Sequence, residues 1–348
     1  MTTIRSRMNL LAALLFCTMT AVCAADRVNA QVPAPESSPE GRVVTRAGVP
    51  LRTLNNGTEV PALGLGTQNV RLQGDTSEQG RNLLNETTRQ AVVCALRAGY
   101  RHLDTAHGYL NEQGVGQGMI DSGVPREEIW LTSKLWPSEF GEGKTARAID
   151  EMLERLQVDY IDCVYLHHPV GDFLGAWRDL ETAYRAGKVR ALGISNFDNW
   201  PEAFQQIISE SQIKPQMLQI ECHPLAQRRT TRALAAEHHL QVECWFPLGH
   251  GDPALLNNET LSEIAAAHRK SIVQVILRWH IQEGLVPIPG ATNPDYIREN
   301  IALFDFELSD DEMDRIRSLD KGEDGRFFNL DYRQPETKER FLTPRDKE

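Results

Sequence analysis

The chain has 348 residues, of which 41% are hydrophobic and 24% charged, a balance typical of a globular protein. Its formal net charge of −11, with no basic stripe in the sequence, argues against nucleic acid as a partner, because such binding needs cations opposite the phosphates. This length allows one large domain or two ordinary ones.

The first residues have the pattern of a secretory signal peptide, predicted over residues 1–24. Arg5 and Arg7 precede an apolar stretch over residues 9–21, and small residues follow at 22–24. The stretch is shorter than the roughly 20 residues of a membrane span. We therefore expect an exported protein with no membrane attachment after cleavage. The alternative is a cytoplasmic protein whose start codon is wrongly assigned.

Residues 25–46 are rich in Pro, Ser and Glu and are predicted to be a flexible linker. The folded part is expected to begin near Ala47 and to form one barrel domain over residues 47–325. Residues 326–348 are expected to be a C-terminal tail.

Short β-rich runs alternate with longer amphipathic segments from residue 50 onward. Residues 51–54 and 59–63 flank Asn55-Asn56-Gly57, a sequence that favours a tight hairpin turn. Eight strands are then predicted, at residues 62–66, 101–104, 129–133, 161–166, 191–195, 217–221, 241–245 and 285–289. Helices between them are predicted at residues 87–98, 145–156, 177–186 and 260–267.

This alternation predicts an α/β fold, a (β/α)8 TIM barrel with the N-terminal β-hairpin closing the barrel bottom. A doubly wound sheet is the alternative, but Gly64-Leu-Gly66-Thr67 lacks the third glycine of its usual first turn. Polar or aromatic residues also fall at or near the carboxyl ends of successive predicted strands, where barrel enzymes build their active sites. They are Asp104, Lys134, His167, Ser195, Gln219 and Trp245.

Several of these residues lie in motifs that resemble the aldo-keto reductase family. Asp104-Thr-Ala-His-Gly-Tyr109 and Leu166-His-His-Pro169 are two of them. The others lie at residues 63–67, 132–136, 187–197, 219–224, 247–249, 299–300 and 304–308, in the family's order, so that the resemblance covers about residues 47–325. The short segment between His167 and Trp177 resembles the compact bacterial members of the family.

The resemblance implies a catalytic set of Asp104, Tyr109, Lys134 and His167. Tyr109 would be the general acid, Lys134 would lower its pKa from the reference value near 10, and Asp104 would hold Lys134 charged. His167 would orient the substrate carbonyl. Taken singly, each residue has an ordinary structural explanation, such as a helix cap, a surface lysine or core packing. Their joint occurrence in matching motifs favours catalysis.

No metal site is expected. Adjacent strand residues point to opposite faces, which argues against zinc at His167 and His168. The four cysteines that follow the predicted signal peptide are expected to be buried free thiols, because none has the spacing of a metal or disulfide framework. They are Cys94, Cys163, Cys222 and Cys244.

The resemblance also implies a nicotinamide cofactor. Ser195, Asn196 and Gln219 would hydrogen-bond the carboxamide, and Trp245 would stack on the ring where the family usually has Tyr. Leu248 and Gly249 would cover the pyrophosphate. The full set of implied cofactor-binding residues is Gly66, Thr67, Asp104, Ser195, Asn196, Gln219, Trp245, Pro247, Leu248, Gly249, Pro289, Ala291, Thr292, Glu299 and Asn300, of which the last two would contact adenine.

The chain departs from the family where a 2′-phosphate is usually read. Gly290 stands at the usual lysine, Ala291 at the usual serine and Tyr296 at the usual arginine. A phosphate needs cationic partners, and Arg298 is offset by two positions. The cofactor is therefore expected to be NADP(H) or NAD(H), with the preference left open.

The substrate pocket implied by the resemblance consists of Tyr109, Trp136, His167 and His168. His168 replaces a Trp that usually lines this pocket and makes it more polar. The expected function is NAD(P)H-dependent reduction of a small aldehyde or ketone by a monomeric enzyme. The alternative is a regulatory or sensor protein that binds the cofactor with little turnover.

Overall fold

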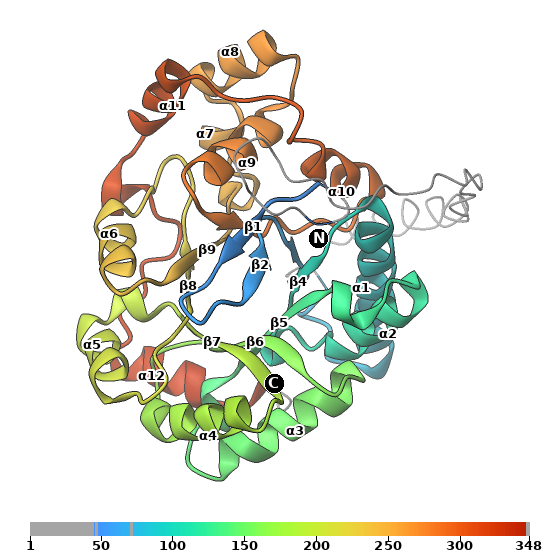
Figure 1. Ribbon diagram of the computed structural model, residues 1–348, viewed down its shortest axis with the longest axis vertical. Helices are drawn as coiled ribbons and strands as arrows, with labels where there is room; N and C mark the ends of the chain where they lie inside the picture. The colour runs from blue at the N-terminus through green and yellow to red at the C-terminus, as the bar shows by residue number, and fades with distance from the viewer. Residues whose placement is uncertain (1–44, 46–47, 70–71, 346–348) are drawn as a thin grey trace, which may run out of the picture. The chain divides into compact units, whose positions relative to one another are not determined.

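The computed structural model describes residues 45, 48–69 and 72–345 of the chain. It is a ring of eight parallel strands surrounded by helices (Figure 1), which confirms the predicted barrel. In order around the ring, the strands are β3 (Leu65–Gly66), β4 (His102–Asp104), β5 (Trp130–Leu135), β6 (Ile161–Leu166), β7 (Val189–Ser195), β8 (Met217–Glu221), β9 (Gln241–Trp245) and β10 (Val286–Pro287). Each matches one predicted run, with shorter ends at β3 and β10.

The barrel closes between its first and last strands. The Gly64 amide donates to the Pro287 carbonyl and the Gly66 amide to the Pro289 carbonyl, each over 3.1 Å. A side chain at Gly66 would meet the Ile288 carbonyl oxygen at 2.7 Å, so glycine is required for this approach. The closing contact places residues 66–67 beside residues 289–290, as a site at the carboxyl ends of the strands needs.

The N-terminal hairpin lies across one end of the strand ring (Figure 1). Its strands β1 (Leu51–Thr53) and β2 (Glu59–Pro61) pair antiparallel. Leu54 and Val60 belong to a buried cluster with Trp130 and Met217, which begin strands β5 and β8. The hairpin therefore closes the end opposite the carboxyl ends of the strands, as predicted.

Helices form the outer layer. The first, α1 (Glu78–Ala98), begins earlier than predicted because the Ser77 side chain accepts from the Gly80 amide and caps it. The others are α2 (Glu112–Ser122), α3 (Lys144–Leu156), α4 (Phe173–Arg185), α5 (Pro201–Glu210), α6 (Arg229–Glu237), α7 (Pro253–Leu256), α8 (Glu259–His268), α9 (Ile272–Gln282), α10 (Pro294–Ile301), α11 (Asp310–Arg317) and α12 (Pro335–Leu342). Short 3-10 turns are η1 (His107–Tyr109), η2 (Arg126–Glu128), η3 (Pro137–Glu139), η4 (Phe197–Asn199), η5 (Gly249–Gly251) and η6 (Gly322–Gly325).

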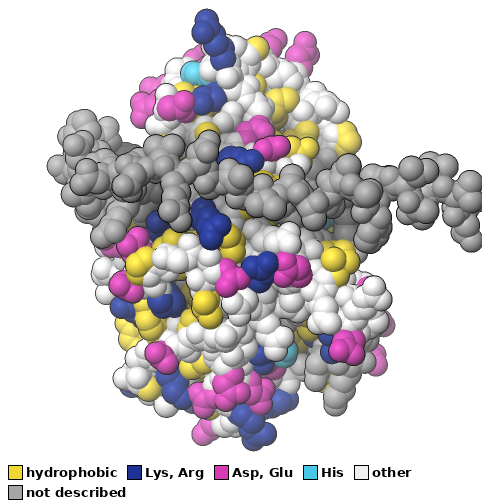
Figure 2. All heavy atoms as spheres, turned by 90° about the vertical axis from the view of Figure 1, so that its right-hand side faces the viewer, with side chains coloured by type: hydrophobic (Ala, Val, Ile, Leu, Met, Phe, Trp, Pro, Cys, Tyr) yellow, Lys and Arg dark blue, Asp and Glu magenta, His cyan; other side chains and the backbone are white. Residues whose placement is uncertain are grey.

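The predicted signal peptide and linker lie outside the described residues, apart from residue 45. Within the described part, none of the helices combines the length and apolar character that a membrane crossing requires. The face seen in Figure 2 carries acidic and basic side chains interspersed with apolar ones.

Candidate active site

Three of the four predicted catalytic residues are in direct contact at the carboxyl end of the barrel. Lys134, near the end of β5, donates through Nζ to both carboxylate oxygens of Asp104, at 2.6 and 2.7 Å. The same Nζ lies 3.2 Å from the Tyr109 hydroxyl, which η1 places directly after β4. All three side chains are buried. The strand register therefore assembles the phenol, ammonium and carboxylate as predicted.

The buried ion pair is charged at neutral pH. Burial raises the pKa of Asp104 to about 6, against the opposing effect of Lys134. Burial also disfavours the charged form of Lys134, but the nearby Asp104 carboxylate and Tyr109 oxygen raise its pKa above the ordinary value. Near pH 7 the ammonium thus stands between a carboxylate and a protonated phenol.

The pKa of Tyr109 differs from the sequence prediction. Burial raises the pKa of this hydroxyl above its ordinary value, and Lys134 acts in the opposite direction without reversing the shift. Lys134 does act to lower the pKa of Tyr109, as predicted. The net shift is upward, however, so the prediction of a lowered pKa was wrong. The phenol keeps its proton over the ordinary pH range, as a proton donor must.

His167 follows β6, and its ring lies edge-on to Tyr109 with the ring centroids 5.8 Å apart. Burial, together with His168, Lys134 and Arg345, holds the pKa of His167 well below its usual range. The imidazole is therefore neutral. Its Nδ1 atom is buried and has no hydrogen-bond partner among the described residues.

His167 and His168 do not point to opposite faces. Their rings stack with centroids 4.4 Å apart and planes within 11°. The argument used against zinc here was wrong, because β6 ends at Leu166 and strand alternation does not extend to these two residues. His168 is held instead by the Tyr332 hydroxyl, 2.8 Å from its Nδ1.

A polar network that the sequence analysis missed lies next to Asp104, inside the barrel. Gln219 donates through Nε2 to Asp104, over 2.8 Å, and to Glu243. Glu243 also accepts from the Tyr165 hydroxyl over 3.0 Å, and its Oε1 lies 3.1 Å from His102 Nε2. Burial opposes the charged form of Glu243, but His102, Gln219 and Lys134 together lower its pKa. The signal in the sequence was an acidic residue, Glu243, between Val242 and Cys244 in a predicted strand.

The predicted carboxamide contacts lie beside this network. Ser195 ends β7, and Asn196 takes a left-handed backbone conformation with φ of 65°. Asn196 Nδ2 donates to the His167 carbonyl over 2.9 Å and to Ser195 Oγ over 3.0 Å. Because both Nε2 contacts of Gln219 go to carboxylates, its Oε1 is the atom available to accept from a ligand amide.

The polar atoms at the barrel mouth fit a bound nucleotide. The Thr67 hydroxyl and the Trp245 indole nitrogen are buried and have no hydrogen-bond partner among the described residues. Thr67 is tied to Asp104 by a 2.9 Å backbone hydrogen bond, and Trp245 ends β9, in register with Glu221 of β8. Pro247, Leu248 and Gly249 follow Trp245 and lead into η5.

The remaining predicted cofactor residues lie further from the catalytic group. Pro289 and Ala291 follow β10, Thr292 is exposed, and Glu299 and Asn300 lie on α10. Among the described residues, α10 packs against α1 and α9.

The two residues at the missing cation positions, Gly290 and Tyr296, are both exposed. Arg298 lies two positions after Tyr296 on α10. Its guanidinium donates to Asp295 over 2.6 Å, and a second nitrogen lies 4.0 Å from Cys94 Sγ on α1. The prediction that Arg298 is turned elsewhere fits these contacts.

Residues 326–345, which we call the C-terminal strap, pack over the mouth of the barrel. Phe341 lies 4.0 Å from the His168 ring and 5.5 Å from the Trp136 ring, measured between centroids. The Trp136 indole donates to the Thr343 carbonyl over 3.1 Å. Contacts with the barrel thus continue past the predicted domain boundary at residue 325.

The beginning of the strap lies on the cofactor side. Phe328 packs edge-on against Trp245, with centroids 5.5 Å apart. The Phe327 and Phe328 amides donate to the Glu221 carboxylate over 2.6 and 3.2 Å. The sequence analysis missed these contacts. The signal was the presence of four aromatic residues in a segment treated as a tail, namely Phe327, Phe328, Tyr332 and Phe341.

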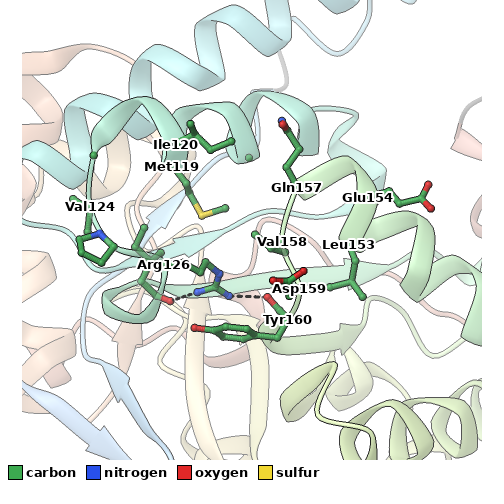
Figure 3. A pocket seen from close by; sticks show the side chains of 14 residues that line it. Met119, Ile120, Val124, Arg126, Leu153, Glu154, Gln157, Val158, Asp159 and Tyr160 are labelled. Atoms are coloured by element: carbon green, nitrogen blue, oxygen red, sulfur yellow. Dashed lines mark hydrogen bonds between the residues drawn. The ribbon is translucent and has the colours of Figure 1, made fainter.

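A separate surface pocket lies at the other end of the barrel. It is formed between α2, α3 and the turns before β5 and β6, with Met119, Leu153 and Tyr160 in its lining (Figure 3). Arg126 crosses its floor and donates to the Tyr160 carbonyl over 2.9 Å. Because it lies near the amino ends of the strands, this pocket is remote from the catalytic group.

Comparison with known proteins agrees with this geometry. A family profile described as "Aldo/keto reductase family" matches residues 62–321. The chain belongs to the aldo-keto reductase family. It is 43% identical to a glyoxal reductase of Bacillus subtilis over 271 residues, which cover 78% of this chain and 92% of the relative. It is 42% identical to a 9,11-endoperoxide prostaglandin H2 reductase of Trypanosoma cruzi over 283 residues, covering 79% and 95% respectively.

A solved structure extends the comparison to the cofactor. The aldo-keto reductase of Bombyx mori in complex with NADP superposes with a TM-score of 0.73 at 32% identity, covering 82% of this chain and 97% of that one. This aldo-keto reductase is therefore an oxidoreductase that reduces aldehydes or ketones to alcohols with a nicotinamide cofactor.

Proposed function

We propose that Tyr109 is the general acid of carbonyl reduction in this protein. The observation that carries the proposal is the 3.2 Å contact between its hydroxyl and Lys134 Nζ, next to the Lys134–Asp104 pair. When bound, a nicotinamide cofactor would supply a hydride to the carbonyl carbon, and the carbonyl oxygen would then need a proton. The Tyr109 hydroxyl donates that proton, and the ammonium stabilises the phenolate that forms.

His167 positions the substrate in this proposal. Its neutral imidazole donates a hydrogen bond to the carbonyl oxygen, so that the oxygen is shared between His167 and Tyr109. A charged imidazolium would compete with Tyr109 as the proton source. The low pKa of His167 excludes that competition at neutral pH.

The proposed substrates are small aldehydes and ketones, including dicarbonyls. The glyoxal reductase relative supports a small dicarbonyl, and strap side chains pack against His168 and Trp136 at the proposed substrate site. The second imidazole, His168, favours substrates with a second polar oxygen over purely apolar ones. A panel of glyoxal, methylglyoxal, simple aldehydes and apolar ketones tests this order by kcat/KM. A higher kcat/KM for the apolar ketones would contradict it.

Replacing Tyr109 by Phe tests the catalytic assignment. General acid catalysis contributes about 10²–10⁴-fold, so Tyr109→Phe is expected to lose turnover by that factor. Binding of NADH or NADPH, followed by fluorescence quenching, should change little. Tyr160→Phe, at the surface pocket remote from the catalytic group, is the matched control and should keep full turnover. Undiminished turnover in Tyr109→Phe would place the acid elsewhere. Negligible turnover in the wild type would favour the sensor interpretation instead.

We further propose that the protein has little preference for NADPH over NADH. Gly290 and Tyr296 offer no charge to a 2′-phosphate, and Arg298 is paired with Asp295. The double variant Gly290→Lys, Tyr296→Arg should bind NADPH at least tenfold more tightly while its affinity for NADH stays the same. Equal gains for both cofactors, or a hundredfold NADPH preference in the wild type, would contradict the proposal.

We also propose that the protein is a monomer and that it is exported. The proposal of export rests on the basic and apolar pattern of residues 5–24. N-terminal sequencing of the protein recovered after cell fractionation tests the export. A cytoplasmic product that begins at Met1 or Met8 would contradict it.

A further inference from the structure

Two cysteines and a histidine converge on the side of the sheet away from the catalytic group. The Sγ atoms of Cys222 and Cys244 and a ring nitrogen of His280 all lie within 4.8 Å of one another. Cys222 directly follows β8, Cys244 lies on β9, and His280 lies on α9. All three residues are fully buried.

The cluster is separate from the active site because successive strand residues face opposite sides of the sheet. Glu243 points into the barrel, where it contacts Tyr165 and Gln219. Its neighbour Cys244 belongs instead to the apolar layer between the strands and the helices, together with Cys222. The proposed reduction uses none of the three residues of the cluster.

Both ring nitrogens of His280 face backbone carbonyl oxygens. Its Nδ1 lies 2.8 Å from the Ile276 carbonyl oxygen, and its Nε2 lies 3.0 Å from the Cys222 carbonyl oxygen. A neutral imidazole carries a hydrogen on only one nitrogen, so one contact must set a lone pair against a carbonyl oxygen. A second ring proton removes the conflict, and so does a metal cation bound at that nitrogen. Donation from Nδ1–H to a backbone carbonyl is also the usual orientation for a histidine that binds metal through Nε2.

The donor set favours zinc. Two thiolates and a neutral imidazole around Zn²⁺ sum to zero charge, which suits a site with no exposed surface. Ligand bonds of about 2.0–2.3 Å place ligand atoms about 3.3–3.8 Å apart, so the three side chains need to approach by at most roughly 1 Å. The Cys222 carbonyl oxygen, beside Nε2, is available for a fourth position.

We propose that Cys222, Cys244 and His280 form a structural zinc site that joins β8 and β9 to α9. Binding releases the thiol protons to solvent, since the thiolate is the ligand, and changes no oxidation state. The Cys222 thiol faces the Gln227 carbonyl oxygen, 3.7 Å from Sγ. This proposal stands independently of the catalytic assignment.

The full-length protein, purified from cells grown with added zinc, provides the test. We expect about one zinc per chain by mass spectrometry after dialysis, and at least tenfold less in Cys244→Ala. Cys163→Ala, which removes a buried thiol from β6, is the matched control and should retain the zinc. Circular dichroism establishes that each variant is folded.

Cobalt substitution of the wild-type protein provides a measurement that needs no variant. Thiolate-to-cobalt charge-transfer absorption with tetrahedral visible bands supports the site. Equal zinc in wild type and Cys244→Ala would overturn it, as would a wild type with no zinc and no cobalt bands. Loss of two titratable thiols without metal would also overturn it, in favour of a Cys222–Cys244 disulfide.

Discussion

The catalytic network and the C-terminal strap meet at the same barrel mouth but are held in different ways. Asp104, Lys134 and Gln219 lie on three strands and are joined by charged or polar hydrogen bonds between buried atoms. The strap contacts the site through the Phe341 ring and the Thr343 carbonyl. The barrel strands thus position the charged groups, whereas a segment outside the strand ring packs against His168 and Trp136.

If the network carries the chemistry, removing its cation should have the largest effect. Lys134→Met should lower kcat by about 10³-fold, within the range of acid catalysis. It also leaves the Asp104 carboxylate buried without its partner. Breaking a buried ion pair in this way costs about 3–5 kcal/mol of unfolding free energy. Urea unfolding and steady-state kinetics measure the two losses.

The double variant Lys134→Met, Asp104→Asn separates these two losses. Neutralising both partners removes the unpaired charge, so most of the unfolding free energy should return. Activity should stay low, because no ammonium faces Tyr109. Recovery of activity with recovery of stability would mean that Lys134 serves the fold alone.

The next largest effect is expected from acid. Asp104 has a pKa of about 6, so below that pH it takes up a proton and no longer balances Lys134. We expect kcat/KM to fall about tenfold per pH unit below pH 6. The pKa of His167 is well below its usual range and that of Tyr109 is above its ordinary value, so neither produces this limb.

Asp104→Asn identifies the titrating group. This variant has no carboxyl group at position 104, so the fall near pH 6 should disappear and leave a lower, flat profile. A limb that persists unchanged in Asp104→Asn would assign the titration to another group. Glu336→Gln, an exposed change on α12, should keep the wild-type profile.

The contact between Asp104 and Lys134 was predictable from sequence because strand ends follow from local patterns. Asp104 ends β4, Lys134 precedes the end of β5, and their meeting follows from parallel register. The stacking of His167 on His168 was not predictable, because it depends on where β6 stops. Nor was the net pKa shift of Tyr109, since burial depends on side chains that the strap and neighbouring strands bring together.

The strap illustrates the same limit at longer range. Phe341 lies more than 170 positions from His168, and no local periodicity links the two residues. Aromatic residues in a supposed tail indicate packing without indicating the partner. The capping box formed by Ser271 and Gln274 at the start of α9, by contrast, was a local signal that could have placed that helix.

The smallest expected effect comes from trimming the strap itself. Phe341→Ala removes the ring that packs 4.0 Å from His168 and 5.5 Å from Trp136. Because the ring packs on two residues of the proposed substrate site, we expect KM to rise about tenfold and kcat to change less than twofold, the pattern of lost uniform binding. Glu336→Ala, an exposed change on the same helix, should alter neither constant. A fall in kcat with unchanged KM would show that the strap helps to hold the catalytic residues. The strap and the strand-held catalytic residues would then not be independent of each other.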